Sequence, residues 1–271
     1  MMLRRIEIQM IAPIVVSLYV VMGSQAHAQI TIGNPVAPPP TTPGDGLHVD
    51  YYKLTTFPET IAFSENYIAN NAPNATFIST GVGYPSNNPG GTVSDSTSLS
   101  TYLGPDAATL SNPSVGSNTL DQSIYHYTGY IDITTANLTT TFFLGSDDGS
   151  RLSLNGIQVI DNDGDHGYTT QSQIVDFTAP GLYSVDLISF EDGGVTGVLW
   201  SSSIGAPSGG SVEIPESILY QSAVPEPSSL TLTGMATAAI GLVCLLRRRG
   251  SRSSQDDGVP RRPLANRWGA A

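Results

Sequence analysis

The sequence has a single cysteine, Cys244, among 271 residues. One cysteine excludes an intrachain disulfide and any metal site built from several thiolates. Cys244 lies within an apolar run, 230–246, where we expect a packing or lipid-facing residue rather than a reactive thiol. The fold must therefore depend on an apolar core, with or without help from a bound metal ion.

Positive charge is almost absent from the middle of the chain. Residues 29–226 contain two basic side chains, Lys53 and Arg151. Three of the 23 acidic residues fall outside this span, namely Glu7, Asp256 and Asp257. The remaining twenty give the span a formal charge of −18. Such a surface repels nucleic acid and anionic lipid and attracts divalent cations, so we expect no nucleic-acid partner. Solubility alone is the other explanation of the charge.

The sequence also lacks the common catalytic motifs. It contains neither a G-x-S-x-G nucleophile elbow nor an H-E-x-x-H zinc motif. The histidines of the middle region, His48, His126 and His166, form no nucleophile pattern. We therefore expect no enzymatic activity. An envelope glycoside hydrolase that uses two of the many carboxylates stays a remote alternative.

Residues 1–28 have the pattern of a signal peptide. Two arginines precede an apolar stretch from Met10 to Gly23, and Ala26-His27-Ala28 is an A-x-A cleavage site. We expect export through the inner membrane and a mature chain that begins at Gln29. The proline-rich residues 29–45 are expected to form a linker.

The C-terminal part combines a short proline-rich motif, an uncharged segment and a basic end. The motif is Val224-Pro225-Glu226-Pro227-Ser228-Ser229, and three arginines follow the uncharged residues 230–246. As a helix, these seventeen residues would extend about 26 Å, near the lower limit for crossing a bilayer. The arginines favour a cytoplasmic C-terminal end. The alternative is a buried core helix.

This order of features, over residues 224–249, resembles the PEP-CTERM sorting signal of bacterial envelope proteins. The resemblance implies a transmembrane helix over 230–246 and a basic cytoplasmic tail over 250–271. It also implies cleavage by a sorting peptidase of the exosortase type, with membrane attachment before processing. The expected location is the cell envelope, the cell surface or the extracellular matrix.

Between the two ends, short strand-like runs alternate with turns. Leu47 to Tyr52 alternates between apolar and polar residues. Further aromatic and β-branched runs lie at 124–133, 138–144, 152–154, 157–160, 173–177, 182–190 and 197–200. Asn155-Gly156 is a strong hairpin turn. We expect an all-β domain over 46–222, an antiparallel sandwich or barrel, with long loops and short strands over 70–118.

Some side chains of these strands have two interpretations. Tyr125, Tyr127 and Tyr130 can stack on sugar rings, but their strand spacing favours the core or a strand face. Trp200 is expected in the core. Arg151 is expected to pair with a nearby carboxylate, because it lies in a strongly acidic domain.

Several segments together resemble a known family. They are Gly46 to Tyr52, Gly145 to Leu152, Asp161 to Gly167, Ala179 to Tyr183, Phe190 to Gly194, and Leu199-Trp200. These runs resemble the PA-fourteen (PA14) domain, which is shared by the anthrax protective antigen, flocculins, fungal adhesins and bacterial glycosidases. The resemblance covers about 45–222 and implies the β-sandwich of that family.

The resemblance also implies a calcium site. In lectin-like members, two adjacent aspartates joined by a cis peptide bond bind one Ca²⁺, which then binds sugar hydroxyls directly. These aspartates match Asp147 and Asp148. The second loop of the family matches Glu191-Asp192-Gly193-Gly194, so that Asp192 would supply a side chain and Gly194 a backbone carbonyl. Where the adhesins typically carry asparagine, this sequence has an acidic residue.

The acidic residues also have interpretations that need no family. Calcium takes six to eight hard oxygen ligands, which paired carboxylates supply. An ordinary turn is the alternative for Asp147-Asp148-Gly149, since turns favour aspartate.

A second acidic group, Asp161, Asp163 and Asp165, begins like an EF-hand loop. The match then fails because His166 replaces the required glycine and Ser172 the required glutamate. A ligand-facing or calcium-stabilised loop and a solvated hairpin loop both stay open. His166 would contact a ligand or order the loop by a hydrogen bond.

The sequence therefore predicts an exported, surface- or matrix-associated carbohydrate-binding module that depends on Ca²⁺. Its partner would be a glycan or exopolysaccharide. The alternative is a structural matrix protein or a protein-interaction domain that binds no sugar.

Overall fold

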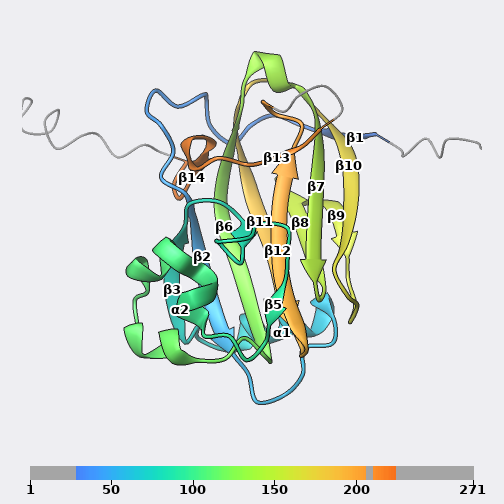
Figure 1. The fold of residues 1–271 in the computed structure, drawn as a ribbon. Coiled ribbons are helices and arrows are strands. Elements are labelled where there is room, and N and C mark those ends of the chain that lie inside the picture. Colours follow the sequence, from blue (N-terminus) through green and yellow to red (C-terminus); the bar gives the residue numbers. More distant parts are fainter. Residues whose placement is uncertain (1–28, 206–209, 224–271) are drawn as a thin grey trace, which may run out of the picture.

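Most apolar residues that alternate along the strands face one core, and a smaller cluster beneath the helix at Ile61–Asn70 includes Ile124, Ile188 and Phe190. The strands form two sheets (Figure 1). The computed structural model describes residues 29–205 and 210–223. The first sheet has the spatial order β1 (Ile30–Ile32), β10 (Thr169–Phe177), β7 (Thr139–Asp147), β12 (Val195–Ser202) and β13 (Val212–Glu213), with β4 (Gly83–Tyr84) and β5 (Val93–Ser94) also paired to β12. The second has the order β3 (Ala75–Ser79), β2 (Leu47–Lys53), β6 (Ser123–Ile133), β11 (Gly181–Glu191), β8 (Ser150–Leu154) and β9 (Ile157–Asn162), with β14 (Leu219–Tyr220) paired to β6. The prediction of a mostly antiparallel, two-sheet β fold is confirmed.

The core lies between the sheets and is rich in aromatic rings. Trp200 of β12 is fully buried, and its ring centroid lies 5.8 Å from that of Phe142 on β7. On the other sheet Tyr51 and Tyr125 are buried with centroids 5.4 Å apart. Burial of each such side chain contributes about 1.5–3 kcal/mol. Tyr125, Trp200 and the equally buried Tyr127 thus lie in the core, as predicted.

The predicted hairpin turn joins β8 to β9. Asn155 and Gly156 have φ angles of 50° and 74°, which asparagine and glycine tolerate best. The Asn155 side chain also accepts a hydrogen bond from the backbone N–H of Ser184, at 2.7 Å. The turn therefore fixes the register of β8 and β9 and ties it to β11.

The prediction that residues 70–118 form long loops with short strands is wrong in part. The segment contains helix α2 (Leu99–Leu103) and 3₁₀ helices at Gly104–Thr109 and Pro113–Ser117, and it places Phe77, Tyr84 and Tyr102 in the core. Just before it lies helix α1 (Ile61–Asn70), which the sequence analysis did not predict. Further 3₁₀ helices lie at Thr135–Asn137 and Glu216–Ile218. Helix α2 and the 3₁₀ helices of residues 70–118 were not predicted because five or six residues are too few to show an amphipathic period.

The prediction that residues 29–45 form a linker is wrong for the start of that segment. Ile30–Ile32 form β1, which pairs in parallel with Val175 to Phe177 of β10. Ile32 is fully buried. The backbone of Val36 and Ala37 also bonds to Leu182 at the start of β11. The segment is therefore part of the sandwich, because its few apolar residues fill the edge of the core.

The expected signal peptide, sorting motif, membrane helix and basic tail, residues 1–28 and 224–271, lie outside the described residues. Within 29–205 and 210–223, every helix is too short or too polar to cross a bilayer.

The first and last described strands lie at the same end of the sandwich. β1 pairs with the end of β10, and β14 pairs with Tyr130 and Ile131 near the end of β6. At the opposite end β7 finishes, β8 and β12 begin, and β11 finishes (Figure 1). The chain thus enters and leaves the domain away from the Asp147 end.

Candidate functional site

Strand ends from the two sheets bring carboxylates together at one end of the sandwich. Asp147 is the last residue of β7 in the first sheet, and Glu191 is the last residue of β11 in the second. The turn that follows Asp147 is joined to β11 because Asp148 N–H donates to the carbonyl of Phe190 at 3.2 Å. Gly149 completes this junction, since a Cβ there would meet the Phe190 ring at 2.5 Å. The paired aspartates are thus held against the end of β11.

Five carboxylates converge in two overlapping groups of three. Asp147, Asp148 and Glu191 have oxygen atoms within 4.8 Å of one another, and so do Asp148, Asp165 and Asp192. We call the first group the inner triad and the second the outer triad. The inner triad is entirely buried, whereas in the outer triad Asp192 is half-buried and Asp165 exposed. The Asp147–Asp148 peptide bond is cis, as the family resemblance implied.

Backbone N–H groups from two loops orient the paired aspartates. Asp148 accepts hydrogen bonds from the N–H of Asp192 at 2.9 Å and from the N–H of His166 at 3.2 Å. Asp147 accepts one from the N–H of Tyr168 at 2.9 Å. The loop after β9 and the loop after β11 are therefore both fastened to the site. The remaining carboxylate lone pairs are free to bind a ligand.

Burial and mutual repulsion disfavour the charged forms of these groups. Burial, together with Asp192 and Asp147, raises the pKa of Asp148 to about 6. Burial, together with the charge of Asp148, raises the pKa of Glu191 to about 9, and the Thr196 hydroxyl only moderates that rise. Burial also raises the pKa of Asp147 and of Asp192. Burial is the first cause of each of these raised pKa values, because it disfavours the charged carboxylate.

The three aspartates at the end of β9 and in the loop after it make different contacts. Asp165 joins the outer triad. Asp163 instead accepts the N–H of Ile61 at 2.7 Å and so caps the start of α1, and Asp161 accepts from the Gln158 side chain at 3.1 Å. Of the three, the structure therefore brings only Asp165 to the paired aspartates.

His166 orders this loop. Its ring nitrogens lie 3.1 Å from the carbonyl oxygens of Asn162 and Gly167, and its N–H donates to Asp148. These contacts match the loop-ordering interpretation of His166.

On the second predicted loop, Asp192 reaches the cluster, but the carbonyl of Gly194 already accepts the N–H of Asp95 at 3.0 Å. In return, Gly194 N–H donates to the Asp95 carboxylate at 3.0 Å. Sequence analysis missed Asp95, which lies in a segment without a motif. It also gave Glu191 no role, although a glutamate at the buried end of an apolar strand is an unusual residue.

The predicted ion pair of Arg151 is confirmed. Its guanidinium contacts Glu65 of α1 and lies 3.1 Å from Asp186 of β11. Lys53 pairs with Asp121 at 2.7 Å. Within the described residues, neither basic side chain therefore neutralises the five-carboxylate cluster.

The donor set of the cluster fits a hard divalent cation. All of its ligand atoms are carboxylate oxygens, which suit Ca²⁺ and exclude a soft, thiolate-type site. Unpaired, mutually repelling carboxylates gain from a cation that neutralises them. The buried acidic cluster is thus able to bind a metal ion.

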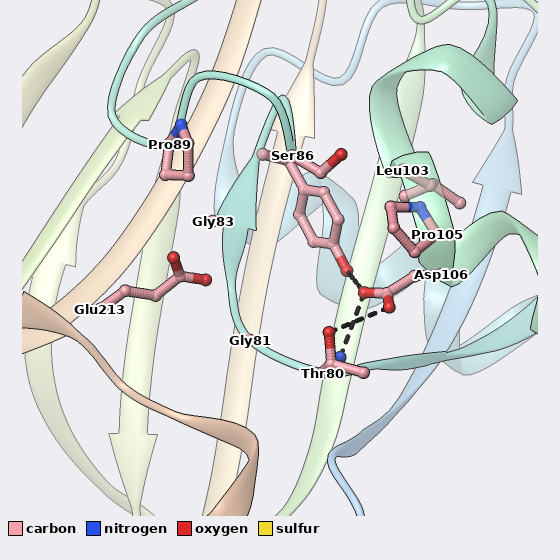
Figure 2. Close-up of a pocket in the computed structure, with 10 residues that line it drawn as sticks. Thr80, Gly81, Gly83, Ser86, Pro89, Leu103, Pro105, Asp106 and Glu213 are labelled. Atoms are coloured by element: carbon pink, nitrogen blue, oxygen red, sulfur yellow. Dashed lines mark hydrogen bonds between the residues drawn. The ribbon is translucent and has the colours of Figure 1, made fainter.

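A separate hollow of about 200 Å³ lies beside β4, between Asp106 and Glu213 (Figure 2). Asp106 accepts hydrogen bonds from the Tyr84 hydroxyl at 2.6 Å and from the Thr80 N–H at 3.1 Å. Figure 2 shows Glu213 apart from this bonded group. Asp106 is buried and fully engaged, so its role in the hollow is structural.

Replacing Asp106 with alanine is expected to lower the free energy of unfolding by about 2–3 kcal/mol. The substitution removes one of the two acceptors of the buried Tyr84 hydroxyl, leaving Ser79, and frees both the Thr80 amide and the Thr80 hydroxyl. Urea denaturation followed by circular dichroism measures the loss. Glu213→Ala is the matched control and should cost less than about 1 kcal/mol; equal losses would contradict a structural role specific to Asp106.

No protein-family model matches the sequence, and no curated protein matches it. The structure, however, is similar to solved β-sandwich domains. A PA14 sugar-binding domain from an RTX adhesin superposes with a TM-score of 0.56 at 24% identity, covering 66% of this chain and 99% of that domain. The PA14 domain of the antifreeze protein MpAFP gives a TM-score of 0.56 at 22% identity, covering 70% of this chain and 100% of that domain. The chain therefore has a PA14-like fold.

Proposed function

We propose that this protein is a lectin-like, carbohydrate-binding module that uses Ca²⁺ at the Asp147 end of the sandwich. The observation that carries the proposal is the convergence of the two carboxylate triads on Asp148. A PA14-like fold supports it, since one similar structure is described as a sugar-binding domain of an adhesin.

In this proposal Asp147, Asp148 and Asp192 hold the cation. When bound, a calcium ion supplies open coordination positions that hydroxyl pairs of a sugar can fill in place of water. The backbone N–H groups of Asp192, His166 and Tyr168 keep the two aspartates in place. The exposed Asp165 lies at the rim, where it can accept hydrogen bonds from a glycan.

The acidic site favours neutral glycans over anionic ones. Beyond the five carboxylates, the described residues are strongly acidic in composition. Their two basic side chains, Lys53 and Arg151, are already paired with carboxylates. Anionic sugars would be repelled over roughly a Debye length, about 8–10 Å. We propose a neutral surface glycan or exopolysaccharide, bound reversibly and without bond breaking.

The same proposal places the protein outside the inner membrane. Residues 1–28 would direct export, and residues 224–249 would hold the chain at the membrane until an exosortase-type peptidase cuts it. Both described ends lie opposite the acidic cluster. A tether at either end would therefore leave the cluster facing outward, toward glycans.

A glycan array probed with residues 29–223 tests this proposal. This span keeps β1, which the sheet needs. Binding in calcium that is lost in chelator is the expected result, and it would also identify the sugar class. Binding that ignores chelator would remove the metal from the proposal. Absence of binding in both conditions would instead favour a matrix or protein-interaction role.

A further inference from the structure

Glu191 is a buried carboxylate whose charge no described basic side chain balances, and the Thr196 hydroxyl, which lowers its pKa, lies outside normal hydrogen-bond geometry. Its side chain is 0% exposed, and neither carboxylate oxygen has a hydrogen-bond partner among the described residues. Both Asp147 and Asp148 place an oxygen within 4.8 Å of it. A buried, unpaired carboxylate is costly, so such groups are normally neutralised or bound to a metal. The Glu191 carboxylate therefore points into the acidic cluster. The contacts among the described residues do not compensate the cost of burying it.

The two triads differ in ways that suit two positions for cations. They share Asp148, whose two carboxylate oxygens accept N–H groups from different loops. The inner triad adds the buried Asp147 and Glu191, and the outer triad adds Asp165 and Asp192 nearer solvent. Asp148 is the one carboxylate that belongs to both triads, so each triad offers two further ligands of its own.

The formal charge of the five-carboxylate cluster also favours two cations. With all five side chains ionised, the cluster carries a formal charge of −5, and the described lysine and arginine side chains pair elsewhere. One divalent cation would leave an excess of −3 in a largely buried site. Two would leave −1. Buried charges that stay uncompensated are strongly unfavourable.

We propose that this end of the sandwich holds two divalent cations, an inner one bound by Asp147, Asp148 and Glu191 and an outer one bound by Asp148, Asp165 and Asp192. The inference rests on the cation site of the proposed function and refines its ligands: Asp148 and Asp192 keep the sugar-binding ion with Asp165 as the third ligand, and Asp147 binds the inner ion, which positions the shared Asp148. The buried inner ion is structural and joins the ends of β7 and β11. The solvent-facing outer ion is the one that exchanges water for sugar hydroxyls.

Counting the cations tests this inference without any glycan. Native mass spectrometry of the purified protein, titrated with Ca²⁺, is expected to show two bound ions per chain. Glu191→Gln keeps the shape of the side chain but removes its charge, so it should bind one. Asp165→Asn should also bind one at calcium levels that saturate both positions in the unaltered protein. Asp161→Asn, at the end of β9 just before the Asp165 loop and outside both triads, is the matched control and should bind two.

Each outcome decides between the hypotheses. A single ion in the unaltered protein, or two ions retained in Glu191→Gln, would overturn the inner position and leave the proposed lectin site standing. No ion at all would also remove calcium from the proposed function. If Glu191→Gln does not fold, as judged by circular dichroism, the count in the unaltered protein still decides the question.

Discussion

Replacing Asp147 with alanine is expected to weaken calcium-dependent glycan binding by at least about a hundredfold. The residue belongs to the inner triad and adjoins Asp148, which both triads share. Loss even of a group that only supports a metal ligand typically costs 10–100-fold in affinity, so loss of a ligand should cost more. Isothermal titration with the sugar identified on the array, in excess calcium, measures the effect.

Two further measurements make this result specific. The domain should stay folded, because the substitution removes one carboxylate and frees only the N–H of Tyr168. Asp176→Ala removes an exposed carboxylate near the opposite end, beside β1, and should leave binding unchanged. Full binding by the Asp147 variant would disprove a metal-bridged mechanism. An equal loss of glycan affinity in both variants would show that binding depends on the overall charge of the domain instead.

The metal-free protein is expected to become less stable as the pH rises from 5.5 to 8.5. The folded-state pKa of Asp148 is raised to about 6 and that of Glu191 to about 9, in both cases mainly by burial. Between their ordinary pKa and these raised values, the folded state binds more protons than the unfolded state. The stability that these protons supply is therefore full below the ordinary pKa, near 4, and is lost as pH rises through about 6 and about 9.

Calcium should reverse this trend, because it binds the deprotonated carboxylates. In chelator, Tm is expected to fall by about 4 °C or more between pH 5.5 and 8.5, and added calcium should raise Tm much more at pH 8.5 than at pH 5.5. Differential scanning calorimetry measures both effects. Glu191→Gln should remove most of the pH dependence seen in chelator.

A constant or rising Tm in chelator would contradict the buried, uncompensated cluster. The carboxyl group of Asp186 cannot produce the same trend. Hydrogen bonds from His126 lower its pKa, so its contribution is lost only as the pH falls below the ordinary carboxylate range. Burial also raises the pKa of Asp132 and of Glu213, so the comparison with Glu191→Gln, rather than the direction of the change, isolates the acidic cluster.

Local sequence signals were sufficient for most strands and for the hairpin turn. The period-two burial of β2 follows directly from the alternation in Leu47 to Tyr52. Asn155-Gly156 placed its turn correctly because few other residue pairs accept two positive φ angles. Asn112-Pro113 is a helix-start signal in the sequence. The asparagine side chain caps the 3₁₀ helix at Pro113–Ser117, and the proline begins it.

Local signals do not predict which strands pair when the strands lie far apart in the sequence. Nothing within Ile30–Ile32 reveals that it joins β10, about 145 residues away, in parallel. Asp161, Asp163 and Asp165 look equivalent in the sequence, yet one helps to form the outer triad and another caps α1. Their roles differ because the loop packs between α1 and the turn at Asp148, which is a property of the folded chain.

The sequence by itself determined the β-rich pattern, the scarcity of basic residues and the adjacent pair Asp147-Asp148, because each is local or compositional. Only the tertiary structure decided which carboxylates share a site. Glu191 and Asp165 reach Asp148 because strands from both sheets end at one place and the intervening loops are bonded there. Burial at that junction then raises the pKa values of these carboxyl groups and makes a set of scattered acidic residues into a cluster that is able to bind a metal ion.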